Sequence, residues 1–262
     1  MKKLFWFGAV CVLLAPGAAK AQSAFDGTWK VNTSKTRLPT QARRYLLQNG
    51  VWHCETCAPP INVKADGQDH KVASGTACSD TTNVKVIDDR TIEITTKKDG
   101  RVTVQAKGTV SPDGKMLTFA YTEACNADVE PVTYKEDFAR VANGPAGAHA
   151  ISGSWREAKM NVSDNGLLMT LKLEGNRVTY SDPTGVSYTA VSGGPSVLKK
   201  GDPDHTMVAV TLVGKTIKEI DRVNGKVTGY ERMTVAADGK TINDVSTDVK
   251  TGRTTRSLYE KQ

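Results

Sequence analysis

The sequence carries one pattern twice, with the second copy 125 residues after the first. The segment 91–136 contains the motifs T-I, D-G-R-V-T, T-V, D-G-K and Y-K-E. The segment 216–261 contains T-I, N-G-K-V-T, T-V, D-G-K and Y-E-K in the same order. Upstream, Gly27–Lys30 (GTWK) is matched by Gly153–Arg156 (GSWR). Repeats that stack into solenoids are about 20–50 residues long, so each copy here is expected to form a domain with its own core.

The first residues have the parts of a secretory signal peptide. Lys2 and Lys3 form a basic start, residues 4–15 are apolar, and Ala-Lys-Ala at 19–21 is a cleavage site of the small-x-small type. The apolar run is too short to span a bilayer comfortably. We expect a signal peptide over 1–21 and a periplasmic or secreted protein with no transmembrane anchor after processing.

The stretch 142–150 (ANGPAGAHA) separates the two copies. It lacks bulky apolar residues and contains glycine and proline, which interrupt helices and strands. It is therefore predicted to be a linker. The first domain is expected over 22–141 and the second over 151–262.

Turn and strand signals fill both copies. Asp-Gly and Asn-Gly dipeptides, which favour two-residue hairpin turns, occur nine times. Between them, segments such as 101–110 alternate polar and apolar residues, which indicates strands with one face in a core and one in water. Short strands joined by tight turns favour meandering antiparallel sheets that close to hide their edges. We expect an all-β protein with two tandem antiparallel β-barrels or half-barrels.

The charge pattern argues against a nucleic-acid partner. The net charge is +7 for the full sequence, and it falls to +4 when Lys2, Lys3 and Lys20 leave with the signal peptide. Charges of both signs alternate along the expected strands, whereas a nucleic-acid footprint needs clustered basic residues. We therefore expect solvated strand faces and no nucleic-acid binding.

Four cysteines follow the signal peptide, all in the first copy: Cys54, Cys57, Cys78 and Cys125. An even number in an exported chain indicates two disulfides, and three connectivities are available. We favour Cys54–Cys57 as a local link and Cys78–Cys125 as a long-range one. A redox pair, or zinc or copper bound with His53, is an alternative for the C-x-x-C motif. An oxidising compartment disfavours free thiols, so neither a metal nor a cofactor is predicted.

No motif of a known catalytic class occurs in the chain. Serine-hydrolase elbows, zinc-protease helices, phosphate loops and calcium loops are all missing from the sequence. Trp52, Tyr180, Tyr188 and Tyr230 could line a ligand site, although core packing is the simpler use for large aromatic rings. The histidines show no metal-ligand spacing: His53, His70, His149 and His205.

The Gly-x-Trp motif at the start of each copy resembles the first strand of lipocalin-like barrels. That resemblance implies that Trp29 and Trp155 plug their barrels. A cation stacked on each indole, from Arg140 and Arg256, would be physically sensible. The chain also resembles a family of uncharacterised exported bacterial proteins with tandem lipocalin-like β-domains, through C-E-T-C-A-P-P at 54–60 and G-P-A-G-A-H-A-I-S-G-S-W at 144–155.

Three functions from different classes fit these features. The first is an exported lipocalin-like binding protein that holds a small apolar ligand, and this is the function we predict. The second is a structural or interaction module of the cell envelope with filled barrels. The third is an extracytoplasmic enzyme that uses residues at a barrel mouth. The sequence assigns no catalytic or ligand-binding residue and no oligomeric state, and it favours a protein that is not an enzyme.

Overall fold

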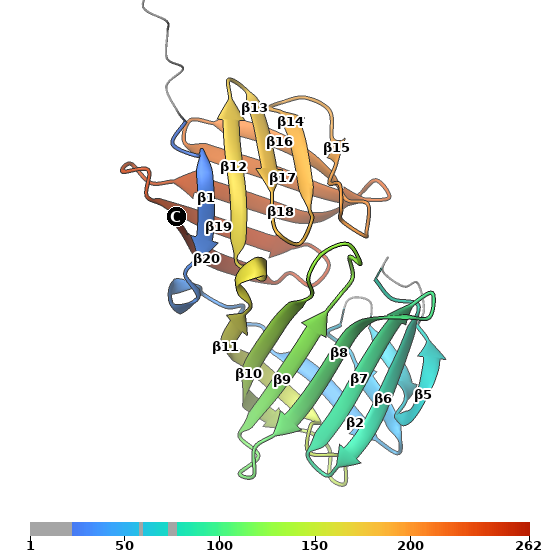
Figure 1. Ribbon diagram of the computed structural model, residues 1–262. Helices are drawn as coiled ribbons and strands as arrows, with labels where there is room; N and C mark the ends of the chain where they lie inside the picture. Colours follow the sequence, from blue (N-terminus) through green and yellow to red (C-terminus); the bar gives the residue numbers. More distant parts are fainter. Residues whose placement is uncertain (1–22, 58–59, 73–77) are drawn as a thin grey trace, which may run out of the picture.

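The computed structural model describes residues 23–57, 60–72 and 78–262. The chain forms two ten-stranded antiparallel sheets, and each curls into a nearly closed barrel (Figure 1). The expected all-β class and the two tandem barrels are thus confirmed. The signal peptide expected over 1–21 lies outside the described residues.

The first barrel has the strand order β4-β3-β2-β11-β10-β9-β8-β7-β6-β5. The β2–β11 pairing joins the first and last strands of this stretch, and the ladder is open between β4 and β5. Its strands are β2 (Arg43–Gln48), β3 (Val51–Cys54), β4 (Ile61–Lys64), β5 (Asp66–Lys71), β6 (Thr81–Asp88), β7 (Thr91–Lys98), β8 (Arg101–Val110), β9 (Met116–Glu123), β10 (Val132–Asn143) and β11 (Gly153–Val162).

The second barrel has the strand order β14-β13-β12-β1-β20-β19-β18-β17-β16-β15. Its ladder is open between β14 and β15, where a backbone bridge between Ser187 and Lys200 links the two edges. Its strands are β1 (Gly27–Val31), β12 (Leu168–Glu174), β13 (Arg177–Ser181), β14 (Ser187–Val191), β15 (Val197–Leu198), β16 (Met207–Val213), β17 (Thr216–Val223), β18 (Lys226–Val235), β19 (Thr241–Asp248) and β20 (Thr254–Lys261).

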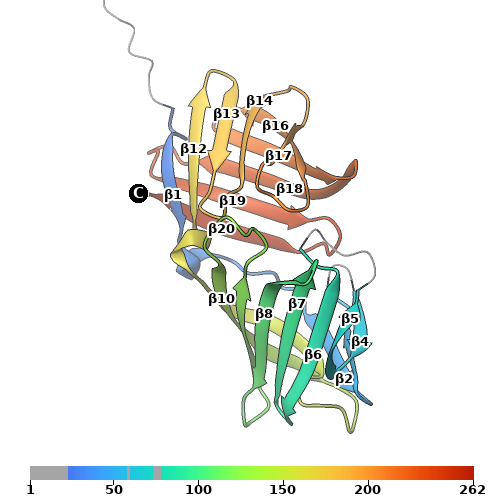
Figure 2. The same cartoon turned by 45° about the vertical axis from the view of Figure 1, so that its right-hand side comes forward.

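The barrels do not follow the boundaries of the sequence repeat. Strand β1 lies between β12 and β20 in the second barrel, while β11 lies between β10 and β2 in the first (Figures 1 and 2). The predicted domains 22–141 and 151–262 would instead put β1 in the first barrel and β11 in the second. The expected linker 142–150 belongs mostly to the loop of the β10–β11 hairpin inside the first barrel.

A physical reason for this division is the short connection between β10 and β11. Successive antiparallel strands form a hairpin at a small cost in loop-closure entropy, so β11 pairs with the strand just before it. The second barrel then lacks its first strand. Because GTWK and GSWR are near copies, β1 fills that place.

Both Gly-x-Trp motifs bury their indoles completely. Trp29 lies in the core of the second barrel and Trp155 in the core of the first. Each indole N–H donates a hydrogen bond of 2.8 Å to a backbone carbonyl four residues earlier, in Phe25 and Ile151 respectively. Gly153 has a φ of +134°, and a Cβ there would collide with the carbonyl oxygen of the neighbouring strand. Glycine is therefore required two residues before the tryptophan.

Each buried indole is covered by a cation from a neighbouring strand of the same barrel. The Arg140 guanidinium carbon lies 3.9 Å from the Trp155 ring centroid, and Lys261 Nζ lies 5.1 Å from that of Trp29. Arg140 stacks on an indole as expected, but that indole is Trp155 of the second sequence copy and not Trp29 of its own copy. On Trp29 the cation is Lys261, because Lys261 lies directly opposite Trp29 in the β1–β20 pairing and Arg256 does not.

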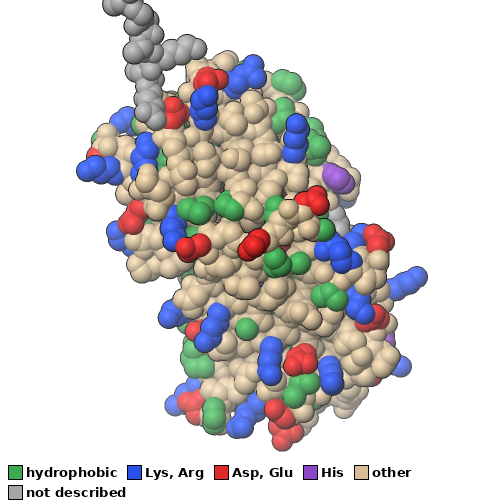
Figure 3. Space-filling model, in the orientation of Figure 1, with side chains coloured by type: hydrophobic (Ala, Val, Ile, Leu, Met, Phe, Trp, Pro, Cys, Tyr) green, Lys and Arg blue, Asp and Glu red, His purple; other side chains and the backbone are tan. Residues whose placement is uncertain are grey.

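Outside the strands, the described residues form two short 3₁₀ helices, Thr33–Lys35 (η1) and Asp164–Gly166 (η2). No helix in the described part of the chain is long and apolar enough to span a lipid bilayer. Acidic and basic side chains are interspersed over the face that Figure 3 shows, as the alternating charge pattern predicts.

Candidate functional site

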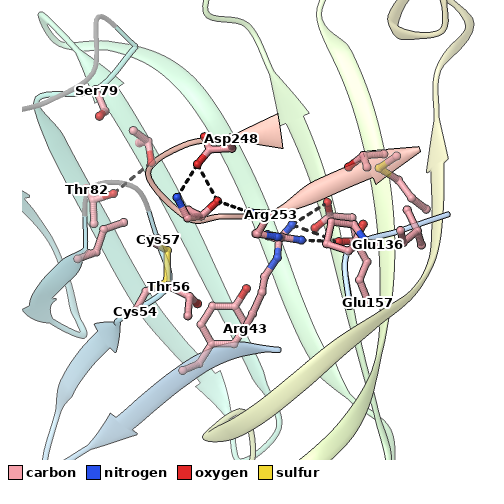
Figure 4. Close-up of a pocket in the computed structure, with 18 of the residues that line it drawn as sticks. Arg43, Cys54, Thr56, Cys57, Ser79, Thr82, Glu136, Glu157, Asp248 and Arg253 are labelled. Atoms are coloured by element: carbon pink, nitrogen blue, oxygen red, sulfur yellow. Dashed lines mark hydrogen bonds and ion pairs between the residues drawn. A yellow bond between two sulfur atoms is a disulfide. The ribbon is translucent and has the colours of Figure 1, made fainter. Parts of the chain in front are cut away.

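A cavity of about 580 Å³ lies where the first barrel meets the β19–β20 hairpin of the second barrel (Figure 4). The first barrel contributes Arg43, Glu136 and Glu157, and the hairpin contributes Thr251 and Arg253. Both barrels are thus needed to form its walls. The remaining lining residues are Leu38, Pro39, Tyr45, Cys54, Thr56, Cys57, Ile61, Val72, Ser79, Thr82, Thr96, Met160, Ser246, Asp248 and Thr255.

Two arginines and two glutamates form an ion-pair cluster in the wall of this cavity. Arg253 Nη2 donates to Glu157 Oε2 at 2.8 Å. Arg43 Nη2 lies 3.4 Å from Glu136 Oε1 and 3.6 Å from Glu157 Oε2. Figure 4 shows the four side chains converging from strands of the first barrel and from the β19–β20 hairpin of the second. Glu157 is the most buried, with 4% of its side chain exposed, so its charge depends on these two guanidinium groups.

The cluster leaves some of its hydrogen-bonding capacity unused. Arg43 Nε, Arg253 Nε and Glu136 Oε2 are buried and have no hydrogen-bond partner among the described residues. Buried polar atoms in folded proteins are nearly always paired with protein or with ordered solvent, and leaving one unpaired is costly. Three such atoms in one wall indicate that the cavity is suited to bind polar groups of a ligand.

Burial raises the pKa of Glu136 above its ordinary value. The positive charge of Arg43 opposes this shift, whereas the nearby Glu157 carboxylate adds to it. The phenol of Tyr121 lies near Glu136, and burial holds the pKa of that phenol well above 10. The neutral form of Glu136 is therefore favoured relative to an exposed glutamate.

Part of the cavity wall is apolar. Tyr45 contributes its ring, which stacks on the buried Trp52 at a centroid distance of 5.3 Å. Ile61, Val72 and the Cys54–Cys57 disulfide extend this wall. A ligand in the cavity would therefore meet both charged groups and apolar surface.

Both expected disulfides are present in the structure. The Cα atoms of Cys54 and Cys57 are 5.4 Å apart, and those of Cys78 and Cys125 are 5.3 Å apart. These distances are normal for disulfides. The C-x-x-C motif begins at the last residue of strand β3 and not at a helix, so it lacks the helix N-terminus that activates thioredoxin-type cysteines.

The interior of the second barrel contains a separate buried acidic cluster. Glu219 on β17 lies directly opposite Glu231 on β18, and Asp244 on β19 lies beside them. Lys199 Nζ lies 3.5 Å from Glu219 and 2.9 Å from Asp221. Burial, and then the charge of Glu219, raise the pKa of Asp244 to about 7. Burial likewise raises the pKa of Glu231 well above its ordinary value.

The two barrels differ sharply at these interior positions. The strand registers align Glu219, Glu231 and Asp244 with three apolar residues of the first barrel. These three residues are Ile94, Ala106 and Phe119. The duplication has thus kept the sheet while placing acidic side chains in the second barrel where the first has apolar ones.

The aromatic residues considered from the sequence lie in different places. Trp52 is buried in the core of the first barrel, and Tyr180 stacks on Tyr188 at 5.3 Å inside the second. The Tyr188 hydroxyl donates a hydrogen bond to Glu219. Tyr230 is half exposed, and none of these four rings lines the cavity.

The histidines also lie away from the cavity. His70 pairs with Asp66 at 2.8 Å, and His149 Nε2 contacts the Asp88 carbonyl oxygen at 2.7 Å. None of the four histidines is among the lining residues. Within the described residues, no group of three or more His, Cys, Asp and Glu side chains is arranged to hold a metal ion.

Sequence reasoning did not identify the ion-pair cluster. Arg43, Glu136, Glu157 and Arg253 are far apart in the chain, and only the sheets bring them together. One local signal existed. Glu157 lies two residues after the core residue Trp155, so the alternation of a strand suggests an inward-facing carboxylate.

The fold and the cavity define a class of protein: a tandem pair of ten-stranded antiparallel β-barrels, with a cavity between them that both polar and apolar residues line. Comparison with models of known protein families and with curated proteins found no match for this chain. No family is therefore identified, and the function has to be argued from the cavity.

Proposed function

We propose that this protein binds a small molecule in the cavity between the first barrel and the β19–β20 hairpin. The observation that carries the proposal is a space of about 580 Å³ whose wall holds three buried polar atoms without partners. Binding sites for small molecules commonly have volumes of about 300–1,000 Å³, apolar walls and a few converging polar groups. The cavity has each of these properties.

The ligand we propose differs from the purely apolar one expected from the sequence. Tyr45, Ile61 and Val72 suit an apolar body, but Arg43 and Arg253 would be left with unpaired donors beside it. Burying unpaired polar groups is unfavourable. An amphiphile, with polar atoms at the ion-pair cluster and an apolar part against Ile61 and Val72, suits both kinds of lining residue.

Binding explains the site better than catalysis does. A general base needs a carboxylate that is free to accept a proton from the substrate. Glu157 instead accepts hydrogen bonds or charge from two guanidinium groups, at 2.8 Å and 3.6 Å. Such a carboxylate is a structural anchor.

We further propose that the protein is exported and that its barrels are related to the lipocalins. The signal-like residues 1–21, the two disulfides and the Gly-x-Trp motifs support this assignment. A binding protein in an oxidising compartment would keep the Cys54–Cys57 wall of its cavity intact without a reducing system.

Native mass spectrometry of the mature protein, purified from its own host without detergent, tests the proposed function. We expect an additional mass that stays bound in gentle ionisation and is released when the protein is unfolded. A protein that carries no small molecule, and acquires none from an extract of its host, would contradict the proposal.

A blocking variant localises the binding. Ser246 is exposed and lines the cavity, so Ser246→Trp would fill the space without disturbing a core. Asn243 is exposed on the same strand but does not line the cavity, so Asn243→Trp is the matched control. The first variant should lose the bound mass and the second should keep it.

A further inference from the structure

We propose that the ligand is a small amphiphile with a single anionic head, such as a carboxylate or a sulfonate, held between the guanidinium groups of Arg43 and Arg253. This inference rests on the proposed function and names the chemical class of the ligand. Arg43 belongs to the first barrel and Arg253 to the second, so a bound anion would bridge the two barrels.

The charge balance of the cluster favours a monoanion. Arg43 and Arg253 carry two positive charges, and Glu157 carries one negative charge in close contact with both. The fourth group, Glu136, lies in surroundings that favour its neutral form. When Glu136 is protonated, the cluster has one positive charge in excess, and a ligand with one negative charge neutralises it.

The free hydrogen-bonding groups point to the same chemistry. Arg43 Nε and Arg253 Nε are both donors without an acceptor. A carboxylate or sulfonate offers at least two acceptor oxygens, and arginine forms its strongest hydrogen bonds with such groups. A neutral Glu136 could donate its own proton to a third acceptor position on the same head. A cationic head would instead leave both donors unpaired.

Small shifts of the side chains are required before the anion can bind. The two Nε atoms are buried, although the Arg43 and Arg253 side chains are 23% and 19% exposed. Arg253 follows the turn between β19 and β20, and the turn carbonyl of Gly252 accepts a hydrogen bond of 3.2 Å from Gln41. The anion is expected to draw the hairpin closer to the first barrel.

The geometry also predicts how binding depends on pH. Ionisation of Glu136 places a second negative charge beside the head, so affinity for an anion should fall as the pH rises through the raised pKa of Glu136. The titratable and charged groups that face Glu136 come from β2, β9, β11 and the second barrel: Arg43, Tyr45, Tyr121, Glu157 and Arg253.

Two fluorescent probes with one aromatic body separate this inference from the proposed function. 1-Anilinonaphthalene-8-sulfonate carries one sulfonate, and N-phenyl-1-naphthylamine lacks it. We expect both to bind the mature protein at one site, with the sulfonate about 10- to 100-fold tighter, as charge-assisted hydrogen bonds imply. Decanoate should displace the neutral probe at lower concentration than decylammonium does.

Arginine variants locate the effect. Arg253→Gln should weaken binding of the sulfonate probe by about 10- to 100-fold and leave the neutral probe unchanged. Arg253→Lys keeps the charge and should lose only part of the affinity. Arg256→Gln, an exposed arginine three residues further along in β20, should change neither. Thermal unfolding of each variant verifies that it is folded.

Each outcome decides one of the two proposals. Equal affinity for the two probes, or better displacement by decylammonium, would overturn the monoanion while leaving a small-molecule site in place. Loss of both probes in Arg256→Gln would show binding elsewhere on the surface and would also overturn it. If neither probe binds at all, the proposed function itself fails.

Discussion

Replacing Trp29 with alanine should weaken the second barrel, although Trp29 belongs to the first sequence repeat. The indole is fully buried in the second core, donates a 2.8 Å hydrogen bond to the Phe25 carbonyl and lies under Lys261. Truncation of a buried tryptophan costs about 3–5 kcal/mol. That is a large part of the total stability of a typical domain, about 5–15 kcal/mol.

Hydrogen exchange measured by mass spectrometry can report on each barrel separately. In Trp29→Ala, amides of β17–β19 should exchange about 100-fold faster or more, since each 1.4 kcal/mol corresponds to a factor of ten. Amides of β7–β9 should keep their protection. Trp155→Ala is the matched control and should show the opposite pattern, because Trp155 lies in the first core.

The reasoning would be refuted by the pattern that the repeat boundaries predict. If Trp29→Ala reduced the exchange protection of amides in β7–β9 and left that of β17–β19 unchanged, then β1 would belong to the first barrel in solution. The strand pairing described here would be wrong. Equal loss of protection in both barrels would show that they unfold as one unit, and the assignment of each tryptophan to one core would lose its support.

Three further predictions follow from single features of the fold. Removing the Cys78–Cys125 disulfide, which links residues 47 apart in sequence, should cost the first barrel about 4 kcal/mol in the chain-entropy model, measured by denaturant unfolding. The fragment 43–162 contains every strand of the first barrel and should fold alone, with both disulfides and dispersed amide resonances. The pKa of Asp244 is raised to about 7, above the unfolded value near 3.9, so its stabilising effect is complete below about pH 4 and is lost as the pH rises through 7. The second barrel should therefore melt at a lower temperature at pH 8 than at pH 5.5, and Asp244→Asn should flatten that dependence.

The fold class was predictable because its signals are local. Asp-Gly and Asn-Gly turns and the alternation in segments such as 101–110 act within a few residues, and both appear as hairpins and strands in the structure. Strand partners were not predictable in the same way. GTWK and GSWR are so similar that the sequence pattern cannot decide which barrel takes which strand.

The candidate site was harder to predict for a related reason. Arg43 lies on β2, Glu136 on β10 and Glu157 on β11, and these strands become neighbours only through sheet pairing. Arg253 comes from the second barrel, so even a correct model of the first barrel would have missed it. The charged interior of the second barrel was missed too, because Glu219 and Glu231 were not recognised as inward-facing strand positions.

The central claim, that a small molecule binds between the two barrels, is tested most directly by mapping a probe on the folded protein. A titration of N-phenyl-1-naphthylamine can be followed by amide chemical shifts in a ¹H–¹⁵N correlation spectrum. The account predicts shifts that saturate together at Thr56 and Thr82 of the first barrel and at Ser246 and Thr251 of the second, all of which line the cavity. Shifts confined to one barrel, or scattered over the outer strand faces, would contradict it.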